Sequence, residues 1–178
     1  MLNLRNFCAL LLFLGLISCD DQTTKPATEL QQSFNANTQA ISGVELLKSQ
    51  LAMNPNDFNL LSQLGDTYFE SGQYFDAILI YDRAIAVNPM CADCYNDKGL
   101  ASHYVGDTQT AIESFDKAVE INPEFTHAWL SKGFVLASVG RYQEAIAPLN
   151  RVKELDGAGS LAAEADKFLA MVAERGGQ

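Results

Sequence analysis

The sequence contains a pair of cysteines whose spacing is suited to chemistry, Cys91-Ala-Asp-Cys94. The pair lies at the predicted start of a helix, where the helix dipole lowers the pKa of a thiol. The pair could carry out thiol–disulfide exchange, form a permanent disulfide or supply half of a metal site. The residues around it lack the strand–helix–strand pattern of redox-active Cys-x-x-Cys pairs, and only His103 and His127 remain as nitrogen ligands for zinc, without the spacing of a second ligand pair. We therefore interpret the two cysteines as small residues that pack at a junction between helices. Whether a disulfide joins Cys91 and Cys94 stays undecided.

The other polar residues form no recognisable catalytic motif. The sequence has no glycine-rich phosphate loop, no Ser-His-Asp arrangement and no metalloprotease helix. It contains 22 acidic and 12 basic residues, a formal net charge of −10, and an acidic surface repels nucleic acid and anionic lipid head groups. We therefore expect a protein that is not an enzyme, needs no cofactor or metal, and binds neither nucleic acid nor a small-molecule substrate.

A further cysteine, Cys19, follows an apolar run over residues 7–17. The run is shorter than the roughly 20 apolar residues that cross a bilayer, and it has the length of the apolar core of a signal peptide. The residues Leu16-Ile17-Ser18-Cys19 resemble the lipobox of bacterial lipoproteins, with leucine at −3, a small residue at −1 and the cysteine at +1. The resemblance implies removal of residues 1–18 and attachment of lipid to Cys19. An ordinary signal peptide with an incidental cysteine is the alternative.

The lipobox resemblance also sets the expected location. Two or more acyl chains hold a protein stably at a bilayer, so we expect a lipid-anchored protein on the periplasmic or extracytoplasmic face of the cell membrane. Residues 19–40 are polar and lack apolar periodicity, which predicts a flexible tether that begins at the lipidated cysteine. Asp20 favours the inner membrane, because an aspartate there resembles the retention signal of enteric lipoproteins, but the outer membrane stays open.

The elements that position these residues follow a 34-residue recurrence. Small residues and helix breakers recur at this interval, at Pro55, Pro89 and Pro123, at Gly65, Gly99 and Gly133, at Gly72, Gly106 and Gly140, and at Ala77, Ala111 and Ala145. A period of this length indicates one supersecondary unit copied three times. Each copy is predicted to hold two helices of about 12 to 14 residues. The first ends at a glycine in the left-handed conformation, and the second ends at an Asn-Pro pair in the first two copies.

Glycines inside the first helices predict a close crossing of the two helices of each unit. Glycine there costs about 1 kcal/mol relative to alanine, and we expect Gly65, Gly99 and Gly133 to face the alanines Ala77, Ala111 and Ala145. A single helix over residues 41–54 is predicted to cap the N-terminal end of the array. Ser160 is predicted to cap a last helix over residues 160–175, which closes the C-terminal end.

The residues of the three units resemble the tetratricopeptide repeat. Its pattern of a large residue, Leu, Gly, Tyr, Ala, an aromatic residue, Ala and Pro is met in residues 58–91 by Leu61, Leu64, Gly65, Tyr68, Ala77, Tyr81, Ala84 and Pro89. Residues 92–125 offer Tyr95, Lys98, Gly99, Ser102, Ala111, Phe115, Ala118 and Pro123, and residues 126–159 offer Trp129, Lys132, Gly133, Leu136, Ala145, Leu149, Val152 and Gly157. Lys98, Lys132, Ser102 and the missing third proline depart from the pattern. The resemblance implies an all-α, right-handed superhelical solenoid of three helix-turn-helix units between two capping helices.

The repeat resemblance also implies a concave face lined by the first helix of each unit. On that face we expect the partner-binding residues Asn59, Ser62, Asp66, Phe69, Asn96, Asp97, Leu100, His103, Tyr104, His127, Leu130 and Phe134. The subgroup of the family that grips the C-terminal carboxylate of heat-shock chaperones needs lysine and arginine at such positions, and this chain has acidic or neutral residues there. We therefore expect a basic or amide-rich, partly apolar partner; a merely solvated face is the alternative.

Together these features predict a membrane-anchored scaffold or adaptor in the bacterial cell envelope. It would hold a segment of another envelope protein in its concave groove. The alternative function is an accessory or chaperone in envelope redox chemistry or cytochrome maturation, which would use Cys91 and Cys94 while an apoprotein occupies the groove.

Overall fold

The computed structural model describes residues 43–176, which belong to a single unit of the chain. The predicted signal peptide, the lipidated Cys19, Asp20 and the tether lie outside the described residues. So do the first two residues of the predicted N-terminal cap.

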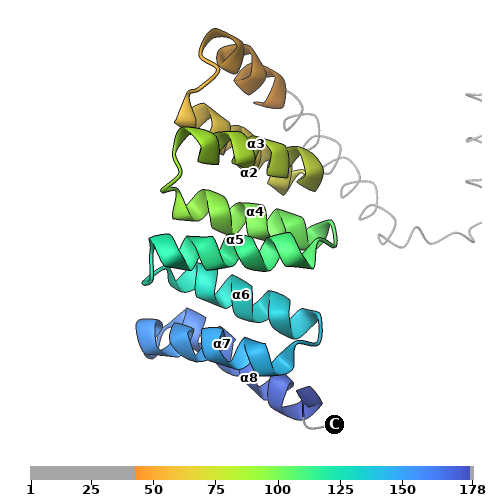
Figure 1. Ribbon diagram of the computed structural model, residues 1–178, viewed down its shortest axis with the longest axis vertical. Helices are drawn as coiled ribbons and strands as arrows, with labels where there is room; N and C mark the ends of the chain where they lie inside the picture. The colour runs from red at the N-terminus through yellow and green to blue at the C-terminus, as the bar shows by residue number, and fades with distance from the viewer. Residues whose placement is uncertain (1–42, 177–178) are drawn as a thin grey trace, which may run out of the picture. The chain divides into compact units, whose positions relative to one another are not determined.

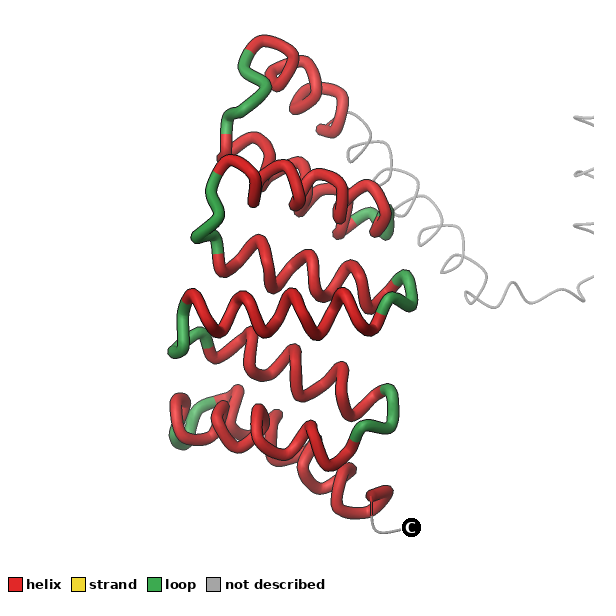
Figure 2. Tube along the Cα trace, in the orientation of Figure 1, coloured by secondary structure: helices red, strands yellow, loops and turns green. Residues whose placement is uncertain are grey.

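Helices follow one another in chain order through the described part. Residues 43–53 are helical, and seven helices come after them: α2 (Phe58–Glu70), α3 (Tyr74–Val87), α4 (Ala92–Tyr104), α5 (Thr108–Ile121), α6 (Thr126–Ser138), α7 (Tyr142–Asp156) and α8 (Ser160–Gly176). From α2 onward each helix packs beside the next, and short loops join them (Figure 1, Figure 2). Residues 43–176 contain no strand. None of the helices in this range is long and apolar enough to cross a membrane.

The ends of the helices follow from the residues that the sequence places there. Positive φ angles of 73°, 85° and 79° occur, as predicted, at Gly72, Gly106 and Gly140, a backbone conformation that costs little only without a Cβ. At the ends of α3 and α5, the Oδ1 atoms of Asn88 and Asn122 accept the backbone N–H two residues later, at 3.2 Å and 3.1 Å. In the third unit, which lacks the Asn-Pro pair, Gly157 with a φ of 62° ends α7.

Side chains from the preceding residues cap the first turns of several helices. Asp107 accepts the backbone N–H of Thr110 at 3.0 Å at the start of α5. At α8 the predicted cap is wrong, because Ser160 is already helical and the Asp156 Oδ2 accepts the Ala162 N–H at 2.9 Å. The short loop between α7 and α8 brings that carboxylate over the first turn of the new helix.

The glycines inside the first helices lie where the two helices of a unit approach closely. A Cβ built on Gly65 would lie 2.6 Å from the ring of Tyr81, and one built on Gly99 would lie 2.6 Å from the ring of Phe115. The prediction that these glycines face alanines is therefore wrong, because the large side chain one turn beyond each alanine occupies the space. We call the three contacts the seam, which consists of Gly65–Tyr81, Gly99–Phe115 and Gly133–Leu149.

Two departures from the repeat pattern are explained by ion pairs between successive units. Lys98 and Lys132 take the repeat position of Leu64, and the Lys98 Nζ lies 2.6 Å from the Asp82 Oδ1. Lys132 forms the same pair with Asp116. Because the Lys98 side chain is only 19% exposed, its methylene chain packs where leucine would and its ammonium group reaches the surface.

Candidate functional site

The predicted partner-binding residues lie on the first helices, α2, α4 and α6. α4 contacts both α2 and α6, so the three helices lie side by side. The face that they form, which we call the groove, mixes very different side chains. Asn96 and Leu130 are buried on it, whereas Asp66 and Tyr104 are exposed. A merely solvated surface would not bury a polar side chain such as that of Asn96. The groove therefore differs from the solvated face that the sequence left as an alternative.

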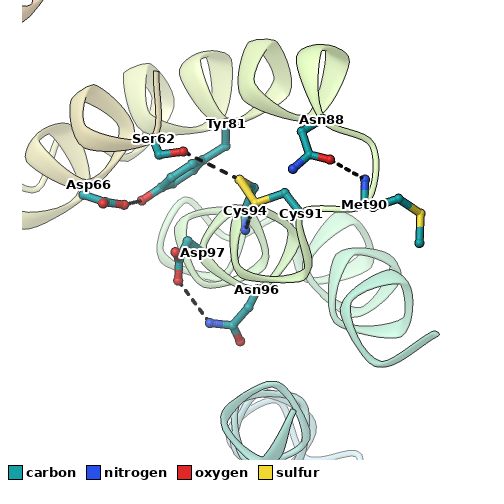
Figure 3. The surroundings of a disulfide bond; sticks show 9 residues. All are labelled: Ser62, Asp66, Tyr81, Asn88, Met90, Cys91, Cys94, Asn96 and Asp97. Atoms are coloured by element: carbon teal, nitrogen blue, oxygen red, sulfur yellow. Dashed lines mark hydrogen bonds between the residues drawn. A yellow bond between two sulfur atoms is a disulfide. The ribbon is translucent and has the colours of Figure 1, made fainter. Parts of the chain in front are cut away.

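Three carboxylates gather in one part of the groove without a basic partner. Asp97 lies within electrostatic range of Asp66 and Asp93, and none of the three forms an ion pair within residues 43–176. Asp66 accepts a hydrogen bond from the Tyr81 hydroxyl at 2.9 Å, and Asp97 accepts one from the Asn96 Nδ2 at 3.0 Å (Figure 3). We call Asp66, Asp93, Asn96 and Asp97 the acidic site.

The acidic site keeps its charge at a cost in free energy. Burial, followed by the charges of Asp66 and Asp93, raises the pKa of Asp97 to about 6, against the opposing effect of the Asn96 hydrogen bond. Asn96 is only 6% exposed, and its Oδ1 has no hydrogen-bond partner among the described residues. A buried acceptor without a donor costs about 1–3 kcal/mol. Among residues 43–176, the carboxylates of this site therefore have no positively charged partner.

Aromatic side chains continue the groove from α2 to α6. The Tyr104 ring stacks on that of Tyr74 with centroids 4.6 Å apart, and it meets Phe69 edge-on at 5.8 Å. The His103 ring meets Phe134 edge-on at 5.7 Å. Burial lowers the pKa of His103, so this ring is neutral at pH 7. Tyr104 remains 56% exposed, which leaves aromatic surface available to a partner.

An open pocket of about 190 Å³ adjoins these rings. We call it the apolar pocket, and it is lined by Leu100, Leu130, Ser131, Phe134, Glu164 and Phe168. The rings of Phe134 and Phe168 have centroids 5.4 Å apart. The sequence prediction missed Glu164 and Phe168 because they belong to α8, outside the repeat pattern, and it missed Tyr74 because this residue belongs to a second helix. The available signal for Phe168 was its place beside the apolar stripe of the last helix.

Some predicted residues lie apart from these two features. Asn59 and His127 are exposed, and neither lines the apolar pocket. The half-buried Ser62 hydroxyl lies 4.0 Å from the Cys94 Sγ, beside the disulfide. A larger hollow of about 390 Å³ between the helix of residues 43–53 and α2 and α3 is lined by none of the predicted residues. Within residues 43–176, no three His, Cys, Asp or Glu side chains are arranged to hold a metal ion.

A disulfide joins Cys91 and Cys94 at the start of α4 (Figure 3). Cys91 is the N-cap residue of this helix, and its Sγ accepts the Cys94 N–H at 3.0 Å. The two residues are 8% and 3% exposed, so the bridge presents little surface to an external thiol. Asp93 lies between the cysteines and Asp97 one turn later. The bridge therefore fixes the helical turn on which the acidic site is built.

Several solved structures share this fold. The crystal structure of MamA protein matches at 21% identity with a TM-score of 0.65, over 85% of this chain and 91% of that one. The first TPR of Spaghetti (RPAP3), bound to the HSP90 peptide SRMEEVD, matches at 21% identity with a TM-score of 0.63, over 68% of this chain and 94% of that one. The TPR2B domain of yeast Sti1, in a complex with pHsp70, matches at 24% identity with a TM-score of 0.63, over 66% and 96%. The predicted all-α repeat solenoid is thereby confirmed.

The family follows from a comparison of sequences. No curated protein matches the chain significantly. A family model described as tetratricopeptide repeat matches residues 62–103 and 103–160, more than half of the 178 residues. These ranges contain most of the three helix pairs from α2 to α7 and both internal ion pairs between units. The chain therefore belongs to the tetratricopeptide repeat family.

Proposed function

We propose that this protein is a membrane-anchored scaffold of the bacterial cell envelope, which holds a segment of a partner protein in the groove. The observation that carries the proposal is the presence of the acidic site and the apolar pocket on the same face. A half-buried carboxylate without a counter-charge, such as that of Asp97, and open apolar surface both cost free energy until something covers them. Concave faces of repeat solenoids are extended binding surfaces, so a protein segment is the natural ligand, and the proposed role is binding rather than catalysis.

Two of the solved relatives support this mode of binding. The Spaghetti domain is bound to the peptide SRMEEVD, and the yeast Sti1 domain is in a complex with pHsp70. The peptide SRMEEVD carries three acidic residues and one basic residue, whereas the groove of this chain is itself acidic. We therefore propose that the partner segment is basic or amide-rich and partly apolar, and that it belongs to another envelope protein.

Whether the partner binds in the groove can be tested with a photo-crosslinking amino acid. One version of the full-length protein carries it at Leu100, in the apolar pocket, and a matched version carries it at Gln109, exposed on α5. We expect partner adducts from position 100 and few from position 109. The double substitution Asp66→Arg, Asp97→Arg should remove the adducts from position 100 without changing the helical circular dichroism. Equal adducts from both positions, or adducts that survive the charge reversal, would sink the proposal.

The proposed anchor is the lipid on Cys19, supported by the Leu16-Ile17-Ser18-Cys19 sequence after the apolar run. It would hold the protein on the periplasmic or extracytoplasmic face of the membrane. We expect the wild-type protein to stay in the membrane fraction through a high-salt wash and the Cys19→Ala variant to be released. A Cys19→Ala variant that resists the wash would rule out the anchor, and the groove proposal would stand without it.

The disulfide favours a second function, an accessory role in envelope redox chemistry or cytochrome maturation. The Cys94 N–H that the Cys91 Sγ now accepts would also stabilise a Cys91 thiolate after reduction. In that role, a Cys94→Ala variant should trap a partner in a mixed disulfide through Cys91, visible on a non-reducing gel. If no mixed disulfide forms, the buried bridge is a structural link and this second function is removed.

A further inference from the structure

We propose that the groove recognises its partner segment at two adjacent points, a lysine or arginine side chain in the acidic site and an apolar side chain in the apolar pocket. The inference rests on the proposed function, because it names the segment that the scaffold holds. The chemistry of the acidic site, its contrast with Asp82 and Asp116, and the distance between the two points carry the argument.

Every unsatisfied polar atom of the acidic site is a hydrogen-bond acceptor. The carboxylate oxygens of Asp66, Asp93 and Asp97 are hydrogen-bond acceptors, whereas the Asn96 Oδ1 is buried and holds Asp97 only indirectly, through the Nδ2 that donates to it. A lysine ammonium group brings three donors and an arginine guanidinium group five, both with a positive charge and no acceptor. A basic side chain therefore supplies the donors and the charge that this site lacks, whereas an anionic ligand would add to the repulsion.

The chain pairs comparable aspartates elsewhere with its own lysines. Asp82 has Lys98, and Asp116 has Lys132, in equivalent places of successive units. No lysine or arginine in residues 43–176 makes an ion pair with the acidic site. Unlike Asp82 and Asp116, the half-buried Asp97 thus has no basic partner among the described residues, and a bound segment can bring one.

The spacing of the two points fixes the spacing of the side chains that they take. Asp97 and Leu100 are three residues apart on α4, which places their Cβ atoms about 5–6 Å apart on one face of the helix. An extended peptide rises about 3.3 Å per residue and points alternate side chains the same way. Side chains two residues apart therefore stand about 6.6 Å apart on one side of the peptide. The recognised sequence is a basic residue and an apolar residue separated by one residue.

Short synthetic peptides test this spacing against the full-length protein purified in detergent. In a glycine–serine background, one labelled peptide carries Lys-Ser-Leu and a second carries the reversed order Leu-Ser-Lys, because the chain direction is open. Controls carry Glu-Ser-Leu, Lys-Ser-Ser and the adjacent pair Lys-Leu. By fluorescence anisotropy at low ionic strength, we expect one of the first two to bind at least about tenfold more tightly than each control, because each control loses either a charge-assisted hydrogen bond or a buried apolar side chain.

Matched variants locate the two points on the protein. Asp97→Asn should weaken binding of the preferred peptide by about tenfold, and Phe134→Ala should remove its preference over Lys-Ser-Ser. The control is Asp76→Asn, which removes the same charge from an exposed position of α3 and should change affinity less than about twofold, because screening weakens distant charges.

The pH dependence of peptide affinity distinguishes direct binding by Asp97 from a merely structural role. The titratable groups that face Asp97 are Asp66 of α2, Tyr81 of α3 and Asp93 of α4. Since the pKa of Asp97 is raised to about 6, lowering the pH from 7.5 to 5 protonates it and should weaken binding of the preferred peptide to the wild-type protein. The Asp97→Asn variant should lose most of this pH dependence.

Either of two results overturns the inference. One is a Lys-Ser-Leu or Leu-Ser-Lys peptide that binds no better than Glu-Ser-Leu; the other is an Asp76→Asn variant as weak as Asp97→Asn. The failure of the proposed function is a separate result: partner adducts that are equal at positions 100 and 109, or that survive the charge reversal. Adducts there without any preference for the basic–apolar peptide would keep the scaffold and reject two-point recognition.

Discussion

The seam and the groove are built from the same helices, yet they differ in how much the three units resemble one another. At the seam, a glycine meets a large side chain of the second helix in every unit. In the groove, one repeat position is occupied in turn by Asp66, Leu100 and Phe134. Positions that keep their chemistry from copy to copy thus build the solenoid, and positions that change it specify what the solenoid holds.

The two regions also differ in how well their groups are satisfied. The large seam residues Tyr81, Phe115 and Leu149 are 2%, 0% and 0% exposed. The groove retains an unpaired Asn96 Oδ1 and a carboxylate, that of Asp97, whose pKa is raised by its surroundings. Changes at the seam should therefore cost stability, whereas changes in the groove should cost little stability or even add to it.

The largest expected effect is at the seam. Phe115→Ala removes a fully buried ring from its contact with Gly99 and should lower the free energy of unfolding by about 3–5 kcal/mol. The measurement is urea unfolding followed by circular dichroism. The control is Phe134→Ala, which removes the same ring from the half-buried apolar pocket and should cost clearly less. Equal losses in the two variants would abolish the distinction between seam and groove.

The disulfide beneath the acidic site should have the next largest effect. Reduction opens a link across the four residues from Cys91 to Cys94, and the chain-entropy model gives a loss of about 2 kcal/mol for a loop of this size. Unfolding of the wild-type protein with and without a reductant measures it. The Cys91→Ser, Cys94→Ser protein serves as the control and should not respond to the reductant. A wild-type protein equally stable in both states would show that α4 needs no bridge to hold the acidic site.

The seam shows how far sequence can predict this fold. The 34-residue period places the helices, their glycine turns and their pairing, because each depends on a local rule that is repeated. It does not give the rotation of one helix against another. For this reason the sequence predicts Gly99 opposite Ala111, whereas the structure places it against Phe115. Ala111 and Phe115 lie one helical turn apart, and the packing of whole side chains decides which of them contacts the glycine.

The groove shows a different limit. Residues such as Asp66 and Leu100 could be placed on one face from their repeat positions alone. Phe168 could not, because it belongs to α8, which does not repeat. The raised pKa of Asp97 also escapes sequence reasoning, since it arises from burial and from a charge on the neighbouring helix α2. Repeat position predicts which residues share a face, and packing decides what that face can do.

Removal of the groove charge should stabilise the protein. The pKa of Asp97 is about 6 in the folded state against the ordinary aspartate value of 3.8, so the folded state binds the proton more tightly and its stability falls as the pH rises from about 4 to 6. After a discount for solvent screening, Asp97→Asn should add about 1–2 kcal/mol at pH 7.5 and almost nothing at pH 4. Urea unfolding at the two pH values measures this gain.

The matched control for this charge is an aspartate that has its own lysine. Asp116→Asn breaks the pair with Lys132 and should lower stability slightly at pH 7.5, by up to about 1 kcal/mol. The two substitutions are chemically identical and should have opposite signs. If Asp97→Asn also destabilised the protein at pH 7.5, the groove charge would be part of the fold and not a feature kept for a partner.

A smaller gain in stability is expected at Ser102, a buried position where the second unit departs from the repeat pattern. Ser102 is 0% exposed, and its Oγ has no hydrogen-bond partner among the described residues. The other units have Tyr68 and Leu136 at this position. Ser102→Ala removes an unsatisfied hydroxyl and should add about 1 kcal/mol to the free energy of unfolding. A loss of stability instead would mean that the Ser102 hydroxyl has a hydrogen-bond partner in the folded protein.

The smallest effect is expected at the ion pair that repeats between units. Lys132→Met keeps the methylene chain that packs in place of leucine and removes only the ammonium group near Asp116, a side chain that is 53% exposed. Exposed pairs contribute about 0–1 kcal/mol, so the variant should differ from the wild-type protein by less than about 0.5 kcal/mol. Lys98→Met, the same change one unit earlier, should behave alike. A loss above about 1.5 kcal/mol in either variant would be too large for a solvent-screened pair. Ion pairs would then contribute strongly to the packing of the units. The charges of the groove would in that case serve the stability of the fold, and they would no longer be evidence of a binding site.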